Sequence, residues 1–416
     1  MTSNKKYPWV LVGLLWIVGL LNYLDRQMLA TMRPAMQSSI TELQSAENFG
    51  YLMGIFLWIY GFMSPVAGLI ADKFSKKWVI TGSLFVWSAV TFAMGYAKSY
   101  HELYWLRATM GISEALYLPT ALALITEFHQ GKTRSLAVGI HMTGLYVGTA
   151  LGGFGATIAA AYSWQITFHV FGIVGIIYSL ILVLFLKNKQ HAEDYIIPFK
   201  KTIIKSSGPF AALRTLFTNV SFWIILIYFA IPSLPSWATK NWLPTLLAQN
   251  LNISMAQAGP IATITIAVSQ FIGVIGGGAL SDWWVRKNIR GRTFTSGIGL
   301  ILTIPALLLL GFGNSLVGFI AAGFCFGVGF GMFDGNNMPI LCQFISSKHR
   351  ATAYGLMNMT GVFFGAFITD VLGKSSDAGK LGNGFAWLAV IVAIAVALLF
   401  TFLRPKKEDY DFESGV

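Results

Sequence analysis

Long apolar stretches recur along the whole chain, separated by short polar segments. Crossing the apolar core of a bilayer takes about 20 mostly apolar residues in a helix. Twelve stretches reach this length, and their approximate limits are 8–36, 48–71, 78–97, 100–128, 135–160, 164–187, 218–246, 257–281, 293–313, 315–343, 351–372 and 384–404. The first is too long for the apolar part of a signal peptide, so we expect it to be retained. The pattern predicts an all-α polytopic membrane protein with twelve transmembrane helices.

The longest polar segment divides these stretches six and six. The expected units are an N-terminal six-helix bundle over 1–187, a cytoplasmic linker over 188–217, a C-terminal six-helix bundle over 218–404 and a cytoplasmic tail over 405–416. The tail is short and acidic, and we expect it to be disordered.

Two motifs recur in both halves of the chain. Residues 68–72 follow the second stretch and 278–282 follow the eighth; each begins with Gly, ends with Asp and is followed by two adjacent basic residues. Residues 111–119 and 331–339 both place an acid and a proline at the same spacing after a Gly. Such parallel repeats are typical of transporters built from two pseudo-symmetric bundles around a shared site.

The composition supports the membrane assignment. Of the 416 residues, 55% are hydrophobic and 11% charged, whereas soluble domains carry roughly 25% charged residues. This excludes a soluble enzyme, a disordered chain and a secreted disulfide scaffold. The two cysteines, Cys325 and Cys342, both belong to one apolar stretch, and their positions indicate neither a disulfide nor a metal site.

The formal charge of +12 is explained by topology, so no nucleic-acid partner is expected. Most Lys and Arg residues fall at alternate ends of the apolar stretches, while the loops between hold only Lys98, Lys374 and Lys380. Because cytoplasmic loops of membrane proteins are enriched in basic residues, this pattern predicts that both termini are cytoplasmic. The short loops favour a multi-pass protein of a bacterial inner membrane.

The loop after the second stretch resembles a known signature. Its pattern, Gly68-x-x-x-Asp72-Lys73-x-Ser75-Lys76-Lys77, is similar to that of the major facilitator superfamily, although Ser75 stands where the family usually has Gly. The resemblance implies two six-helix bundles that rock about a central site. An acid at a helix end facing basic loop residues can form a latch that holds one conformation. The expected latch residues are Asp72, Lys76 and Lys77 in the first half and Asp282, Arg286 and Lys287 in the second.

Ionisable residues inside the apolar stretches are the strongest indication of a functional site. The first stretch contains Asp25 and Arg26, and the fourth contains Arg107 and Glu114. Arg107 and Glu114 are two helical turns apart and share a face, whereas the adjacent Asp25 and Arg26 point about 100° apart. We expect a cavity with two carboxylates and two guanidinium groups. The alternative is an internal salt-bridge network that only holds the helices together.

These residues resemble the anion:cation symporter family, in its Tyr-Leu-Asp-Arg run and its Leu-Arg-(x)6-Glu-Ala run. That family includes bacterial hexuronate, aldonate and glucarate importers, and animal sialic acid and vesicular glutamate transporters. The resemblance implies proton-coupled import of an organic anion, first of all an acidic sugar: a hexuronate, an aldonate, sialic acid or a uronate-containing disaccharide. It implies that Arg26 and Arg107 bind the substrate carboxylate and that Asp25 and Glu114 carry the coupling proton. No cofactor other than the coupling proton, no metal and no enzymatic activity are implied, and a monomer is the superfamily default.

Further contacts follow from family positions. Tyr23 and Tyr60 are expected to hydrogen-bond substrate hydroxyls, and Asn358 resembles the family's amide contact to a sugar acid. Two departures affect the substrate: Leu145 stands where aldonate importers have Gln, and the tenth stretch carries Asp334 and Asn337. Asp334 indicates a third titratable group, or a substrate with many hydroxyls or an amino group, and Asn337 is a further expected sugar contact.

Other interpretations remain open at this point. His141 could titrate near neutral pH, although a core residue is favoured. Lys240 is expected to extend to the outer membrane interface, with a place in the pocket as the alternative. Spinster-like lysolipid or sphingolipid carriers share the Asp-Arg run, although the polar tenth stretch argues against a lipid path. Two Arg residues would also suit an organophosphate exchanger. A non-transporting membrane sensor would need a cytoplasmic partner surface, and a membrane enzyme would need a nucleophile–base pair that the sequence lacks.

Overall fold

The computed structural model describes residues 6–129, 133–188, 209–345 and 350–403, and within these ranges the chain is built from helices. The elements are α1 (Tyr7–Met36), η1 (Thr41–Gln44), α2 (Ala46–Lys73), α3 (Lys76–Met94), α4 (Tyr100–Ala115), α5 (Tyr117–Phe128), α6 (Arg134–Gly152), α7 (Gly155–Ala161), α8 (Trp164–Phe185), α9 (Pro209–Phe217), α10 (Val220–Leu251), α11 (Met255–Val285), α12 (Gly291–Phe312), α13 (Leu316–Asp334), α14 (Asn337–Phe344), α15 (Arg350–Asp377) and α16 (Leu381–Phe402).

Each predicted apolar stretch falls on a helix or on a pair of consecutive helices. Eleven spans in the described ranges are long and apolar enough to cross a membrane, and α6 with α7, bent by 40°, makes a twelfth if counted as one. The prediction of an all-α polytopic membrane protein is therefore confirmed. The exact limits of the two bundles stay predictions, and most of the linker and all of the tail from 405 lie outside the described residues.

The repeated acid–proline motif produces the same break in both halves. The helix α4 ends one residue after Glu114, and Pro119 lies in the first turn of α5; α13 ends at Asp334, and Pro339 lies in the first turn of α14. A proline lacks the N–H that would continue the helical hydrogen-bonding pattern, so it favours a new helix start. The repeat thus places one acid beside a helix break in each half.

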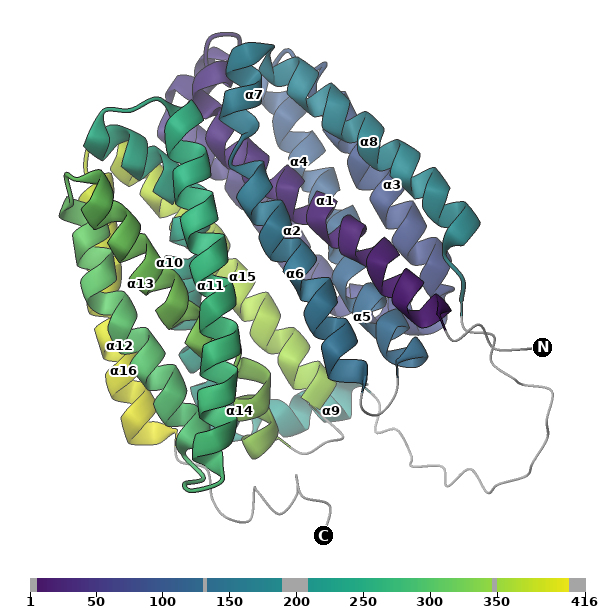
Figure 1. Cartoon of the computed structure of the whole chain (residues 1–416), viewed down its shortest axis with the longest axis vertical. Coiled ribbons are helices and arrows are strands. Elements are labelled where there is room, and N and C mark those ends of the chain that lie inside the picture. Colours follow the sequence, from purple (N-terminus) through teal and green to yellow (C-terminus); the bar gives the residue numbers. More distant parts are fainter. Residues whose placement is uncertain (1–5, 130–132, 189–208, 346–349, 404–416) are drawn as a thin grey trace.

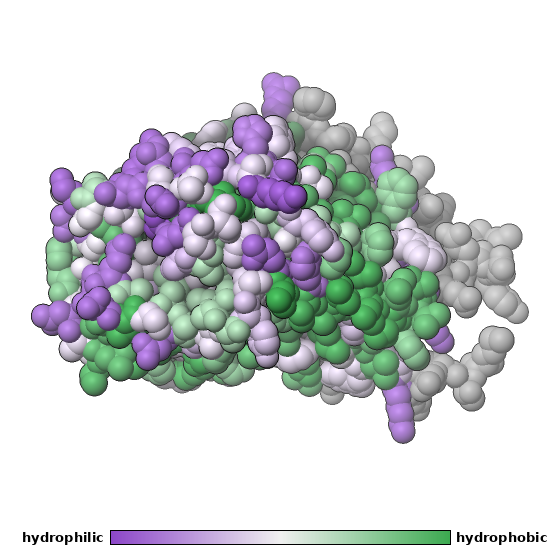
Figure 2. All heavy atoms as spheres, turned by 90° about the horizontal axis from the view of Figure 1, so that it is seen from above, coloured by the Kyte–Doolittle hydropathy of each residue, from purple (hydrophilic) through white to green (hydrophobic). Residues whose placement is uncertain are grey.

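The two halves lie side by side, with α1–α8 in purple to teal and α10–α16 in green to yellow (Figure 1). We call the end where α1 begins and α16 ends the terminus face, and the other end, which carries η1, the opposite face. Seen towards the opposite face, hydrophilic residues gather on this end and hydrophobic residues cover much of the flank (Figure 2). This distribution suits a polar end in water beside an apolar flank in lipid.

Contacts between the halves lie toward the opposite face. The main pairs that meet are α2 with α15 and α6 with α11, and α1 and α7 also reach α10 and α11. At the second pair a Cβ on Gly153 would overlap Thr263 Oγ1 and lie 2.8 Å from the Gly259 carbonyl oxygen, so only glycine allows this approach. Thr157 Oγ1 also donates to the Ala256 carbonyl oxygen at 2.8 Å. The opposite face is therefore closed in this conformation.

Candidate functional site

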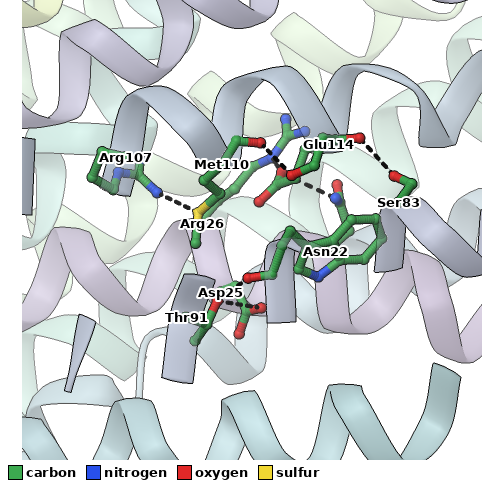
Figure 3. Close-up of polar contacts among 10 residues, drawn as sticks. Asn22, Asp25, Arg26, Ser83, Thr91, Arg107, Met110 and Glu114 are labelled. Carbon is green, nitrogen blue, oxygen red and sulfur yellow. Dashed lines mark hydrogen bonds and ion pairs between the residues drawn. The ribbon is translucent and has the colours of Figure 1, made fainter. Parts of the chain in front are cut away.

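Predicted ionisable residues of the first half do meet, where side chains of α1 reach Glu114 of α4 (Figure 3). Glu114 is 1% exposed, and its Oε2 accepts hydrogen bonds from Arg26 Nε at 2.5 Å and from Asn22 Nδ2 at 3.0 Å. Its other oxygen, Oε1, is buried and has no hydrogen-bond partner in the described part of the chain. Glu114 and Arg26 therefore form a buried ion pair, and the second carboxylate oxygen of Glu114 makes no hydrogen bond in the described structure.

Aromatic rings surround the Arg26 guanidinium on its other sides. Its Cζ lies 5.0 Å from the centroid of the Tyr23 ring, 4.9 Å from that of Phe56 and 4.7 Å from that of Tyr60. Rings at this distance attract a cation through their electron-rich faces. Neither the Tyr23 nor the Tyr60 hydroxyl has a hydrogen-bond partner among the described residues. The two tyrosines predicted to bind substrate hydroxyls therefore lie beside Arg26, and their own hydroxyl groups make no hydrogen bond within the described part of the chain.

Arg107 is buried and forms no ion pair with a carboxylate among the described residues, although Glu114 and Asp25 are its electrostatic neighbours. It is 3% exposed, Nη1 donates to the Met110 sulfur at 3.1 Å, and Cζ lies 4.5 Å from the centroid of the Phe56 ring. Its Nε has no hydrogen-bond partner within the described ranges. A thioether is a weak acceptor, so this guanidinium keeps most of its capacity to bind an anion.

Asp25 faces α3 and is an electrostatic neighbour of Glu114 and Arg107. It is 5% exposed, Oδ2 accepts a hydrogen bond of 3.4 Å from Thr91 Oγ1, and Oδ1 has no partner in the described structure. The prediction that Asp25 and Arg26 point apart is therefore confirmed. The four expected groups are linked as electrostatic neighbours, but in the described structure only Arg26 and Glu114 of the four form an ion pair.

The second half contributes a polar group around the end of α13. Asn337 Nδ2 donates to Asp334 Oδ1 at 3.2 Å, and Asn337 Oδ1 is buried without a partner among the described residues. Lys240 of α10 is an electrostatic neighbour of both Asp334 and Arg26, and its ammonium lies 4.8 Å from the Trp237 ring centroid. The expected extension of Lys240 to the outer interface is therefore wrong, because its side chain lies among the charged residues of the site.

Tyrosines from both halves lie near Asp334. Tyr23 of α1, Tyr146 of α6 and Tyr354 of α15 are all electrostatic neighbours of Asp334. Asn358 follows Tyr354 by one helical turn, so the two share a face of α15; the Asn358 side chain is half-buried, with no hydrogen bond in the described ranges. The sequence did not predict Tyr146 and Tyr354 as site residues, because a tyrosine in an apolar stretch has no distinctive spacing.

His141 is fully buried in α6, and its ring centroid lies 6.0 Å from that of Tyr117. It contacts none of the charged groups described above through any hydrogen bond or ion pair in the described structure. Its surroundings match the expectation of a core residue.

The predicted latch residues make contacts within their own halves. Lys76 Nζ lies 2.8 Å from Glu127 Oε1, the backbone N–H of Lys77 donates to Asn188 Oδ1 at 2.9 Å, and Asp282, with 71% of its side chain exposed, lies 3.9 Å from Arg292 Nη2. Lys287 Nζ lies 4.1 Å from the centroid of the Trp283 ring, and Arg286 is exposed. The side chain of Asp72 lies outside the described residues. No described hydrogen bond or ion pair joins the halves at the terminus face, so the latch itself stays a prediction for the other conformation.

An acid that the sequence prediction missed joins the halves at the opposite face. The Asp377 carboxylate at the end of α15 accepts hydrogen bonds from Ser45 Oγ at 2.7 Å, from Ala46 N at 2.6 Å and from Glu47 N at 2.9 Å. The free N–H groups and the positive dipole at the start of a helix favour a carboxylate there. Asp377 therefore caps α2 across the boundary between the halves.

Asp377→Ala is expected to open the opposite face more often. Losing such a cap costs about 1–2 kcal/mol, or roughly a tenfold change in the ratio of closed to open molecules. The readout is alkylation of a cysteine placed at Ala262, which is buried beside Gln27 and Lys240, in a background of Cys325→Ser and Cys342→Ser. The alkylation rate should rise by about the same factor. Glu42→Ala, at an exposed acid of η1, is the control, and equal rates for both variants would contradict the capping role.

Comparison with known proteins identifies the family of this transmembrane helical chain. The family model of the Major Facilitator Superfamily matches residues 15–369. The chain therefore belongs to the Major Facilitator Superfamily and is a transporter, not an enzyme.

Its relatives among characterised proteins fall into two groups. It is 25% identical to the hexuronate transporter of Bacillus subtilis, covering 97% of this chain and 96% of the relative, and 26% identical to the probable galactarate/D-glucarate transporter GarP of Escherichia coli, covering 85% and 84%. It is also 25% identical to the sphingosine-1-phosphate transporter SPNS2 of Xenopus tropicalis, covering 97% and 85%. These relatives imply a small-molecule substrate and embedding in a membrane.

The fold matches solved transporters. A bacterial homologue of the human lysosomal transporter Spinster, in an inward-facing and unoccupied conformation, aligns with a TM-score of 0.82 at 20% identity over 98% of this chain and 99% of the other. A mutant of the nucleoside transporter NupG aligns with a TM-score of 0.69 at 17% identity over 97% and 99%. At these identities the likeness establishes the fold.

Proposed function

We propose that the protein is a proton-coupled symporter that imports an acidic sugar, such as a hexuronate or an aldonate, across a bacterial inner membrane. Both termini are cytoplasmic in this proposal, as the distribution of basic residues indicates. The terminus face is then the inner side, and the conformation described here is closed to the outside. Access alternates as the two halves rock about the site.

The observation that carries the proposal is the unpaired guanidinium of Arg107. A buried cation without a counter-ion is costly, so the site gains most from a ligand that brings a carboxylate. The second half adds Asp334, Asn337 and Lys240, which suit the hydroxyls of a sugar. The hydroxyls of Tyr23 and Tyr60, unused in the described structure, extend this polar lining. A polyhydroxy acid therefore fits the groups on both sides.

Coupling follows from competition for Arg26. In the structure Glu114 occupies the guanidinium through the 2.5 Å contact of its Oε2 with Arg26 Nε. A proton on Glu114 weakens this contact and frees Arg26 for the substrate carboxylate, because a neutral acid attracts a cation less than a carboxylate does. Proton and anion then enter together, and neutralised charges lower the cost of closing the site. Asp25, a buried electrostatic neighbour of Glu114, holds the same proton in turn with Glu114 in this scheme.

A lysolipid with an anionic headgroup is the second candidate substrate. Aromatic rings line the second half close to Asp334: the Phe333 ring centroid lies 5.1 Å from that of Tyr228, 6.3 Å from that of Phe229 and 5.5 Å from that of Phe330. Tyr228, Phe330 and Phe333 are buried in the described conformation, so an acyl chain would reach these rings only after α10 and α13 separate. The similarity to SPNS2 favours the same alternative.

Counterflow in liposomes separates these candidates. Vesicles containing purified protein are loaded with one unlabelled compound, and uptake of trace labelled compound of the same kind is recorded without a pH gradient. The panel holds a hexuronate, an aldonate, an aldarate, sialic acid, a sugar phosphate and a lysophospholipid. Exchange of a sugar acid supports the proposal. Exchange of the lysophospholipid alone would assign the protein to the lipid carriers, and exchange of the sugar phosphate alone to the organophosphate exchangers.

A further inference from the structure

We propose that Asp370 of α15 is a proton-binding site inside the closed gate at the opposite face, so that closing this gate takes up a proton. The site is distinct from Asp25 and Glu114, because it lies between α2 and α15, where the two halves meet. The proposal concerns the gate and does not depend on which substrate the protein carries.

The position of Asp370 is fixed by a glycine on the facing helix. A Cβ added to Gly54 of α2 would overlap Asp370 Oδ1, so the glycine leaves the space that the carboxylate occupies in this conformation. This oxygen is buried and has no hydrogen-bond partner in the described part of the chain. Closing the gate therefore brings one half's carboxylate against the backbone of the other half and shields one of its oxygens from water.

The cation nearest to Asp370 is engaged elsewhere. Lys374, one helical turn further along α15, is an electrostatic neighbour of Asp370. Its Nζ lies 3.4 Å from Glu47 Oε1 and 5.7 Å from the Tyr51 ring centroid, and 58% of its side chain is exposed. The charge of Lys374 is thus shared with Glu47 and solvent.

The other groups around Asp370 are neutral. The Trp58 indole of α2 donates a hydrogen bond to the carboxylate, and Tyr100 and Tyr104 of α4 are its electrostatic neighbours. From α10, Asn241 Nδ2 donates to the hydroxyl of Thr369, the preceding residue, at 2.8 Å. The Tyr100 hydroxyl does not donate to Asp370, because it donates to the Asn48 carbonyl oxygen at 3.0 Å. The surroundings therefore supply no cation that faces Asp370 alone.

A carboxylate in such a place favours a proton. When ionised, this half-buried carboxylate keeps one buried oxygen without a hydrogen bond in the described structure, and protonation removes the desolvation cost of that oxygen. When α2 and α15 separate, water reaches the carboxylate and the proton can leave. Because the closed gate then binds more protons than the open gate, the ratio of closed to open molecules rises as the pH falls. One such site changes this ratio by up to about tenfold for each pH unit.

The gate can be observed directly without substrate. Spin labels at Thr41 and Ala378, which are exposed on either side of the gate, report the separation of α2 and α15 by pulsed electron resonance in lipid nanodiscs. The background carries Cys325→Ser and Cys342→Ser, and also Asp25→Asn and Glu114→Gln, so that the central acids do not contribute. We expect the short-distance population to grow as the pH is lowered from mildly alkaline to mildly acidic.

Asp370→Asn is the decisive variant, because it keeps the shape of a protonated Asp. It should be mostly closed at every pH and should lose the pH response; Asp370→Ser should lose the response as well and serves if the first variant does not fold. Asp377→Asn is the matched control, an acid at the same interface whose carboxylate is already hydrogen-bonded, and it should keep the pH response with fewer closed molecules. An unchanged pH response in Asp370→Asn and Asp370→Ser would overturn the proposal. Since no substrate is present, a failure of the sugar-acid proposal leaves this result unaffected.

Discussion

Glu114→Gln is expected to exchange a labelled sugar acid across liposomes but not to accumulate it. The neutral amide resembles protonated Glu114, so Arg26 remains free for the substrate carboxylate while no proton can be carried at this position. A pH gradient supplies about 1.4 kcal/mol for each unit and each proton. Without the coupling acid this driving force is lost, and uptake into vesicles with an alkaline interior should stop at the external concentration.

The measurement compares two assays on the same vesicles, counterflow and uptake driven by a pH gradient. The control is Glu102→Gln, because Glu102 is an exposed acid on the same helix, α4; this variant should behave like the wild type in both assays. Loss of counterflow together with driven uptake would show that Glu114 is needed for binding or folding. Accumulation at the wild-type level would exclude Glu114 as the coupling acid.

Arg107→Gln is expected to weaken substrate binding by about 10- to 100-fold. A hydrogen bond to a charged group contributes about 1.5–3 kcal/mol, and each 1.4 kcal/mol is about tenfold in affinity. Arg107→Lys should lose much of the same affinity, because an ammonium lacks the planar fork that matches a carboxylate. Binding is measured by titration calorimetry with the sugar acid identified by counterflow.

The stability of the same variants separates binding from structure. Removing Arg107 takes away a buried charge that has no carboxylate partner, so the melting temperature should stay the same or rise. Arg26→Gln is the matched comparison, because it leaves Glu114 without its cation and should destabilise the protein by about 3–5 kcal/mol. A strongly lowered melting temperature for Arg107→Gln, with unchanged affinity, would assign Arg107 a structural role instead.

The sequence was sufficient to predict the helices and the main polar residues. Apolar length alone located the spans, and the acid–proline repeat predicted equivalent places in both halves, which the structure contains as the breaks after Glu114 and Asp334. The adjacent positions of Asp25 and Arg26 on one helix also correctly predicted that their side chains point in different directions. These features depend on residues near one another along the chain.

Partners between helices could not be predicted in this way. Spacing places Arg107 and Glu114 on one face of α4, but the packing of α1 decides that Glu114 pairs with Arg26 and leaves Arg107 single. The position of Lys240 depends on how α10 meets α1, where Gln27 Nε2 donates to the Lys240 carbonyl oxygen at 2.8 Å.

The gate at the opposite face was missed for the same reason. Asp377 caps a helix that begins more than 300 residues earlier in the chain, at Ala46. Asp370, by contrast, could have been noticed in the sequence. It lies within an apolar stretch, where an acidic residue indicates a function just as Asp25 does. Its role as a gate residue depends on Gly54, which only the packed structure brings against it.

The central claim is that an anion and a proton cross together through the site of Arg26, Arg107 and Glu114. The most direct test records the pH inside dye-loaded liposomes while a sugar acid is added outside, without a pre-formed pH gradient. Our account predicts immediate acidification of the interior with the wild type and none with Glu114→Gln. Substrate entry measured in the same vesicles without any acidification would contradict proton symport.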